Sequence, residues 1–157
     1  MACLAVVRIR GDFRAQGGGV KETLDLLKLH HNHHAVLIPD TPSYRGMLQR
    51  VAHCVAWGEI DSPTLATLLE KRARGSGGRR LTEDYVKSSL GYKDMQEFAQ
   101  ALHEGKTDLR KITSLKPVFR LTPPSGGFPR KLKRHYKDKG EYGYRGEAIN
   151  LLISRMC

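Results

Sequence analysis

The sequence lacks several features that mark common classes of protein. It holds only three cysteines, Cys3, Cys54 and Cys157, which are far apart and form no Cys-x-x-Cys pair. This pattern favours reduced thiols in a cytosolic protein over a disulfide framework. No apolar run is long enough to cross a bilayer, and the short apolar start is followed by Arg8 and Arg10. We therefore expect neither a membrane span nor a signal peptide.

Acidic residues are scarce relative to basic ones. The 157 residues include 27 Lys and Arg against 16 Asp and Glu, which gives a net charge of +11. Such a charge indicates a polyanionic partner. An anionic membrane is the competing partner, but the cations do not lie along an amphipathic helix. The length suits one domain, with two small ones possible, and the apolar content of 39% is enough for one core.

The charge is concentrated in residues 116–145. This segment holds nine Lys and Arg residues against only Asp138 and Glu141, so it supplies seven of the net positive charges. Five aromatic rings are interspersed, and prolines and glycines disfavour regular helix. Clustered cations repel one another unless a polyanion neutralises them, and flat rings stack on exposed bases. We favour a nucleic-acid contact over a solvated loop, because rings and glycines add nothing to solubility.

The first sixty residues predict a β-α-β-α-β unit. Period-two alternation places Ala5, Val7 and Ile9 on one face of a first strand, with Leu4 and Val6 on the other. Thr41 and Pro42 are typical of a helix start. The expected elements are strands at 3–10, 35–38 and 54–57 and helices from 20 to 29 and from Thr41 onward. The fold class is α+β, with the two helices on one face of the sheet.

The remainder is predicted to be helical and then irregular. We expect a helix capped by Ser62-Pro63 and stopped by Gly75, one starting at Thr82, and one with Asp94 and Glu97 as capping box. A short strand is expected within 116–121 and a final amphipathic helix at 147–156. The stretch 122–144 is expected to be a loop that is mobile in the free protein and orders on RNA.

Three patterns invite chemical interpretations. Histidine is a common metal ligand, and four histidines lie close together at positions 30, 31, 33 and 34. No neighbouring cysteine or carboxylate completes a site, so we predict a polar turn and no metal. Glycines 17–19 precede a helix yet lack the Gly-Lys-Ser/Thr ending of a nucleotide-binding loop. We find no convincing catalytic set. An RNA-processing or RNA-modifying enzyme remains an alternative, with His53, His135 or Asp40 as general base.

Several motifs resemble one known family. They are Asp40-Thr-Pro-Ser-Tyr-Arg-Gly-Met, Ala56-Trp-Gly-Glu-Ile, Lys116-Pro-Val-Phe-Arg-Leu-Thr-Pro-Pro-Ser-Gly-Gly-Phe and Gly143-Tyr-Arg-Gly-Glu-Ala-Ile-Asn. Together they resemble the L-thirty family of large-ribosomal-subunit proteins in its long archaeal form, and more distantly the eukaryotic L-seven. The turn at 29–34 lacks the arginine usual in that family, so we do not extend the family's RNA contact to it.

The resemblance implies a ferredoxin-like core at 1–60 with a three-stranded antiparallel sheet, and an archaeal-type extension at 61–157 packed on it. It implies a non-enzymatic, cytoplasmic constituent of the large ribosomal subunit, with no cofactor, that binds large-subunit rRNA near 5S rRNA and neighbouring ribosomal proteins. An RNA chaperone outside the ribosome is a further alternative.

From the charge pattern and the resemblance together we predict an RNA-contacting set. Its members are Arg8, Arg10, Arg45, Gly46, Arg50, Arg79, Arg80, Arg120, Gly126, Gly127, Arg130, Lys131, Lys133, Arg134, His135, Lys137 and Arg145.

Overall fold

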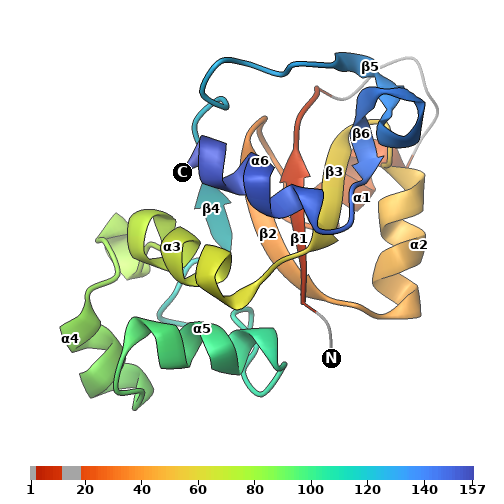
Figure 1. The fold of residues 1–157 in the computed structure, drawn as a ribbon. Coiled ribbons are helices and arrows are strands. Elements are labelled where there is room, and N and C mark those ends of the chain that lie inside the picture. The colour runs from red at the N-terminus through yellow and green to blue at the C-terminus, as the bar shows by residue number, and fades with distance from the viewer. Residues whose placement is uncertain (1–2, 12–18) are drawn as a thin grey trace.

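The computed structural model describes residues 3–11 and 19–157 (Figure 1). The strands are β1 (Cys3–Arg8), β2 (His34–Pro39), β3 (Val55–Glu59), β4 (Val118–Arg120), β5 (Lys131–His135) and β6 (Gly140–Tyr144). The helices are α1 (Val20–Leu26), α2 (Pro42–Arg50), α3 (Ser62–Arg72), α4 (Glu83–Tyr85), α5 (Met95–His103) and α6 (Ala148–Met156). Short helical turns are η1 (Ser76–Gly78), η2 (Val86–Leu90) and η3 (Tyr136–Asp138).

The predicted β-α-β-α-β unit is confirmed, and its sheet is larger than expected. β1 pairs antiparallel with β2 and with β3, as the sequence indicates. Within the described residues, the sheet continues to six strands in the order β4-β2-β1-β3-β6-β5. The three added strands come from beyond residue 60, and β6 runs parallel to both β3 and β5. A sequence pattern fixes the faces of a strand but not the partner that it pairs with at an open edge.

Both faces of the sheet are buried. Ala5 and Val7 belong to a cluster with apolar residues of α3, α5 and α6. Leu4 and Val6 belong to a second cluster with residues of α1 and α2. The two helices of the first unit therefore share one face, as predicted, and the later helices cover the opposite face. The described residues therefore form three layers, and Figure 1 shows α6 crossing the sheet.

The helix caps predicted from the sequence are confirmed for α2 and α4, and both ends predicted for α3 are wrong. Thr41 accepts a hydrogen bond from the backbone N–H of Tyr44 at 3.4 Å, with Pro42 in the first turn. Thr82 caps the next short helix in the same way. The cap of α3 is wrong by one residue, because Asp61 is the N-cap. Its stop is wrong too: the helix ends at Arg72, where Ala73 turns extended, before Gly75 is reached.

The prediction of a loop over 122–144 is wrong for its second half, which contains β5, η3 and β6. Gly140 makes this packing possible, because a Cβ at that position would overlap the carbonyl oxygen of Arg134. Such close backbone approach favours glycine. The glycine run at 17–19 lies largely outside the described residues, and only Gly19, at φ 109°, is described.

Candidate nucleic-acid interface

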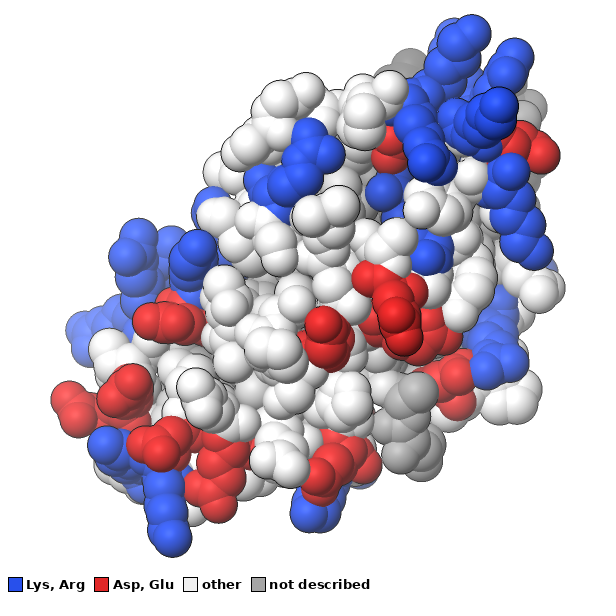
Figure 2. Space-filling model, in the orientation of Figure 1, with Lys and Arg blue, Asp and Glu red and all other residues white. Residues whose placement is uncertain are grey.

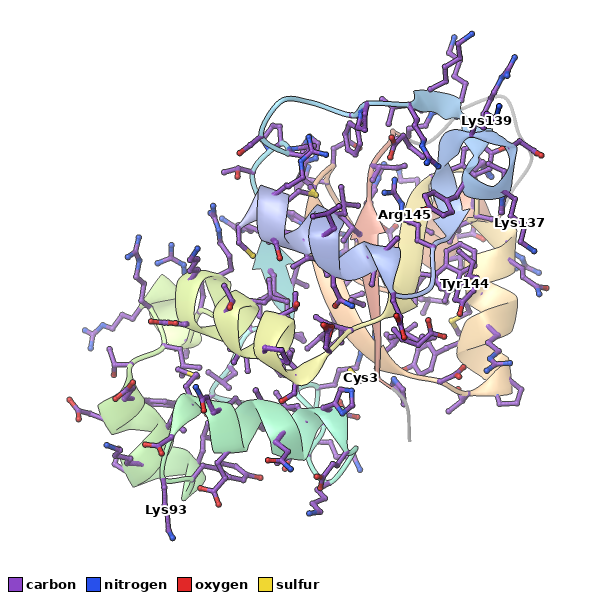
Figure 3. All side chains as sticks on the ribbon, viewed as in Figure 1. Cys3, Lys93, Lys137, Lys139, Tyr144 and Arg145 are labelled. Atoms are coloured by element: carbon purple, nitrogen blue, oxygen red, sulfur yellow. The ribbon has the colours of Figure 1, made fainter. Side chains whose placement is uncertain are left out.

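A group of six exposed cations lies on residues 129–139, which we call the basic arm. β5 forms the last strand of the sheet, and its side chains are mostly exposed. The exposed cations of the arm are Arg130, Lys131, Lys133, Arg134, Lys137 and Lys139. Figure 2 shows cations clustered at this corner of the molecule, and Figure 3 places Lys137 and Lys139 there. Lys139 belongs to this group although it is absent from the predicted set.

The basic arm is held by a buried ion pair at its base. Glu141 is 2% exposed, and its carboxylate pairs with the guanidinium of Arg145, whose side chain is 7% exposed. The same carboxylate accepts the backbone N–H of Arg130 at 2.9 Å. The guanidinium groups of Arg130 and Arg145 lie over the Tyr136 ring, 5.0 and 5.2 Å from its centroid. Arg145 therefore supports the arm from beneath instead of facing solvent.

Three other predicted contact residues also make internal contacts. Arg8 is only 7% exposed and donates to the carbonyl oxygens of Leu29 at 2.7 Å and Arg10 at 3.1 Å. Arg10 is half-buried, and its guanidinium reaches the Leu132 carbonyl at 3.5 Å. The His135 ring accepts the Lys137 backbone N–H at 3.1 Å. These side chains position the arm and the first strand, and they offer little surface to a ligand.

The glycine loop, residues 126–127, precedes the arm. It is exposed, and side chains from other parts of the chain hold it in place. Gly126 and Gly127 have φ values of 78° and 71°, a region that favours glycine. The guanidinium of Arg155 donates to the Gly127 carbonyl at 2.8 Å. Phe128 stacks against the His33 ring with centroids 6.5 Å apart. The loop is thus presented in one shape. Arg155, a residue of α6 absent from the predicted set, supplies much of that order.

The remaining predicted cations lie on two other parts of the surface. Arg45 and Arg50 are exposed on α2, and nothing lies within 4 Å of the position a Cβ would take at Gly46. Arg45 is partly neutralised, since its guanidinium donates to both oxygens of Asp40 at 2.5 Å. This pairing lowers the pKa of the Asp40 carboxyl.

Arg79, Arg80 and Arg120 are exposed near the C-terminal end of α3. Arg74 bridges to Arg80, and Arg72 donates to the Arg120 carbonyl at 3.4 Å, so these segments adjoin. In Figure 2 a second group of cations gathers at this end of the molecule. The predicted set is therefore divided over the arm, the α2 surface and this α3-end patch.

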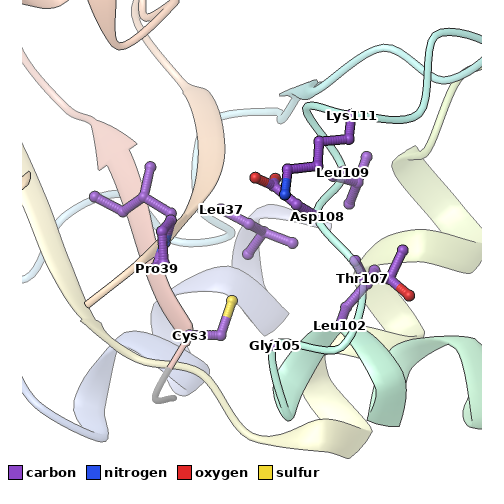
Figure 4. Close-up of a pocket in the computed structure, with 10 residues that line it drawn as sticks. Cys3, Leu37, Pro39, Leu102, Gly105, Thr107, Asp108, Leu109 and Lys111 are labelled. Atoms are coloured by element: carbon purple, nitrogen blue, oxygen red, sulfur yellow. The ribbon is translucent and has the colours of Figure 1, made fainter. Parts of the chain in front are cut away.

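The groups that suggested catalysis do not converge. In residues 3–11 and 19–157, no three His, Cys, Asp or Glu side chains are placed to hold a metal. Burial lowers the pKa values of His33 and His34, which keeps both rings neutral to lower pH. Burial likewise raises the pKa of Cys3 to about 12. That thiol lines a cavity of about 240 Å³ with Leu37 and Asp108 (Figure 4), and a protonated thiol is a poor nucleophile.

None of the helices in the described ranges is both long and apolar enough to span a bilayer.

Comparison with known proteins gives a consistent match. The model of the family described as Ribosomal protein L30p/L7e matches residues 4–55. The large ribosomal subunit protein uL30 of Archaeoglobus fulgidus is 52% identical over 152 residues, which cover 97% of this chain and 98% of that protein. The protein of the same name from Thermofilum pendens is 46% identical and covers 99% of both chains. In Methanoculleus marisnigri the identity is 45% over 97% of this chain.

Proposed function

Because the chain belongs to the family of large ribosomal subunit protein uL30, we propose that it is a structural constituent of the large ribosomal subunit that binds large-subunit rRNA. Members of this family are structural proteins and not enzymes. The observation that carries the RNA-binding role is the basic arm, an exposed edge strand and turn whose cations have no carboxylate among them except Asp138. Phosphates of a folded RNA are the polyanion that such an edge fits.

We further propose a division of labour within the chain. Residues 1–60 form the core unit and residues 61–157 the extension, whose strands lengthen the sheet and carry the arm. Contact with RNA is assigned to the exposed members of the predicted set, with Lys139 added. Arg8, Arg10, His135 and Arg145 are assigned a supporting role, because their side chains make internal contacts. Proximity to 5S rRNA and to neighbouring ribosomal proteins is part of this proposal, as is a cytoplasmic location within the ribosome.

The proposal is tested by the salt dependence of binding to large-subunit rRNA. If about six phosphates are neutralised, the slope of log K against log salt lies on the order of −4 to −5 with the single-strand coefficient. The double variant Lys133→Ala, Lys137→Ala should reduce the magnitude of that slope by about 1.4, roughly 0.7 for each lost contact. A slope near zero for the unaltered chain would refute the electrostatic account.

A matched control removes the same charge elsewhere. Lys87 and Lys93 are also exposed lysines, but they lie far from the arm: Lys87 on η2 and Lys93 in the bend before α5 (Figure 3 labels Lys93). The double variant Lys87→Ala, Lys93→Ala should leave the slope unchanged. An equal loss in both variants would mean that net charge, and not the arm, determines binding.

Two further measurements address the alternatives. An extra-ribosomal RNA chaperone would not sediment with the large subunit, whereas a ribosomal constituent should leave it mainly at high salt. Ordering on RNA stays a prediction for residues 122–130, the part of the segment 122–144 that precedes β5, and amide exchange of the free and the bound chain measures it.

A further inference from the structure

A pocket separate from the basic arm lies between α2 and the strands β3 and β6. It has a volume of about 370 Å³, within the range of roughly 300–1,000 Å³ typical of small-molecule sites. Its lining combines two aromatic rings with four polar side chains. The lining residues are Leu4, Asp40, Arg45, Gln49, Trp57, Glu59 and Tyr144. Figure 3 shows Tyr144 at the end of β6 on the side of α2.

The two aromatic rings form an angled wall. Trp57 and Tyr144 occupy paired positions on the neighbouring parallel strands β3 and β6. Their centroids are 6.4 Å apart and their planes are inclined by 52°. Trp57 is half-buried against the apolar cluster of α1 and α2, while Tyr144 is 41% exposed. The rings touch each other, so a planar ligand would stack on the open face of one of them. Stacking on aromatic rings is a common way to hold an unstacked RNA base.

The polar side chains of the pocket are held by hydrogen bonds to one another, and some of their acceptor sites stay free. The Tyr144 hydroxyl donates to both oxygens of Glu59, at 2.7 and 2.8 Å, and this bond raises the pKa of the tyrosine. Arg45 engages both oxygens of Asp40 at 2.5 Å. A carboxylate offers about four lone-pair sites. The Tyr144 hydroxyl lies between the two Glu59 oxygens, and Arg45 spans those of Asp40, so each acid keeps only its outer lone pairs, each for a single further donor. Among the described residues, the Glu59 side chain receives only the neutral Tyr144 hydroxyl as hydrogen-bond donor.

The charge of the pocket favours the base of a nucleotide over its phosphate. Two carboxylates, Asp40 and Glu59, face the single cation Arg45, so the lining is net negative and disfavours a phosphate group. A base that carries adjacent N–H donors is favoured instead. Guanine carries an exocyclic amino group beside N1–H on its Watson–Crick edge, so it can donate to an outer lone pair of Glu59 without a carbonyl oxygen beside the donor on the minor-groove side. The single donor on the uracil edge, N3–H, is flanked by two carbonyl oxygens that a carboxylate repels.

We propose that this pocket binds one unstacked guanine base of the RNA, with its donor edge on Glu59 and its ring on the Trp57–Tyr144 wall. The guanine O6 then lies toward the amide of Gln49 or the guanidinium of Arg45, both of which line the pocket and can donate to it. This inference rests on the proposed function and deepens it. The arm supplies affinity for any phosphate chain, and the pocket supplies preference for one base.

The only tryptophan of the chain provides the measurement. Trp57 lines the pocket, so its fluorescence reports a stacked ligand directly. The full chain is titrated with GMP and with UMP at equal ionic strength, which keeps the phosphate constant and varies the base. We expect saturable quenching by GMP and an affinity for GMP about tenfold higher than for UMP, as one hydrogen bond to a charged group provides. Equal affinities, or no saturable quenching, would overturn the proposal.

Variants separate the base pocket from the arm. Glu59→Gln keeps the size of the side chain and should abolish the preference for GMP, whereas Tyr144→Leu should weaken GMP about tenfold through the lost ring. A Glu59→Gln chain that keeps the full preference would also overturn the proposal. Should circular dichroism show that one variant is misfolded, the other remains decisive.

The arm variant is the control. Lys133→Ala, Lys137→Ala should lower the salt slope for rRNA and leave the ratio of GMP to UMP affinity unchanged. If the unaltered chain binds rRNA with the expected salt slope but shows no preference for GMP over UMP, the pocket proposal fails and the proposed function stands. Loss of the salt slope in the unaltered chain defeats the proposed function.

Discussion

The basic arm and the helical lobe at residues 82–108 carry opposite charges and are stabilised in opposite ways. The lobe has six carboxylates against three lysines, whereas the arm has six cations against Asp138. The lobe is fixed by apolar burial: the Phe98 ring is fully buried and Leu102 nearly so. The arm is fixed by polar contacts to Glu141 and to the Tyr136 ring. Figure 2 shows the corresponding separation of acidic and basic side chains.

Because of this difference, the net charge of +11 is not spread evenly over the molecule: the lobe is acidic and the arm is strongly basic. An acidic lobe repels phosphate, which supports the proposal that RNA contacts the arm and the two other basic patches. The apolar contacts that stabilise the lobe and the cations proposed to bind RNA are largely in different places. Substitutions in one region should therefore spare the function of the other, and the following experiments challenge that separation.

The largest effect is expected in the lobe. Phe98→Ala removes a fully buried ring and should lower the free energy of unfolding by about 3–5 kcal/mol. Urea denaturation measures this, with the exposed neighbour Gln96→Ala as a control expected to change little. Below the unfolding transition, the salt slope for rRNA should match that of the unaltered chain. A folded Phe98→Ala chain with a reduced slope would break the separation of the two regions.

A slightly smaller effect is expected at the base of the arm. Glu141→Ala leaves the buried guanidinium of Arg145 without its carboxylate and should cost about 3 kcal/mol. Unlike Phe98→Ala, it should also weaken rRNA binding, because the arm loses its support. Replacing both partners, Glu141→Leu with Arg145→Met, should restore part of the stability. If the double variant is no more stable than Glu141→Ala, the ion pair is not what limits stability there.

A pH-dependent effect is expected where the glycine loop meets the histidine turn. Burial lowers the pKa values of His33 and His34, so the unfolded chain binds protons more readily than the folded one. Their contribution to stability is present above the ordinary histidine pKa near 6.5 and is lost as the pH falls below it. Urea denaturation at pH 7.5 and pH 5.5 should show lower stability at pH 5.5. His33→Asn, which suits the positive φ of 65°, should reduce that difference.

The smallest effect is expected on α2. Gly46→Ala places a methyl group in open space within a helix and should stabilise the chain by about 0.5–1 kcal/mol. If RNA approaches the helix backbone closely at this position, the same change should weaken rRNA binding. Unchanged binding would remove Gly46 from the interface and leave α2 to contact RNA through side chains alone.

The sequence predicts the parts of this fold that are governed by local rules. Alternation along residues 3–9 assigned both faces of β1 correctly, and the Thr41-Pro42 start of α2 was found from its capping chemistry. The pairing of β6 with β3 was missed, since it joins segments far apart in the sequence and brings Gly58 against the backbone of Gly146. The parallel pairing of β6 with β5 was missed as well, and it depends on the close approach of Gly140 to Arg134. Residue type and charge alone cannot show such contacts.

The candidate site was predictable to a similar degree. Charge density located the arm, but it did not distinguish exposed cations from supporting ones. Arg8 and Arg145 look like surface residues in the sequence, yet both are directed inward by carbonyl or carboxylate acceptors. The spacing of Glu141 and Arg145 by four residues was a signal that could have revealed the ion pair. Arg155 gave no comparable signal, because its acceptors lie 28 and 30 residues away.

The placement of β1 in the sheet has a consequence for how the chain is made. One face of β1 belongs to the same apolar cluster as Ile149 and Ile153 of α6. The ribosome that synthesises this chain releases β1 before α3, α5 and α6, so that face is covered in stages and its cluster is incomplete until α6 emerges. Completion of the cluster therefore has to await release of the last helix, and a nascent chain halted before α6 should engage holdase chaperones that a full-length chain escapes.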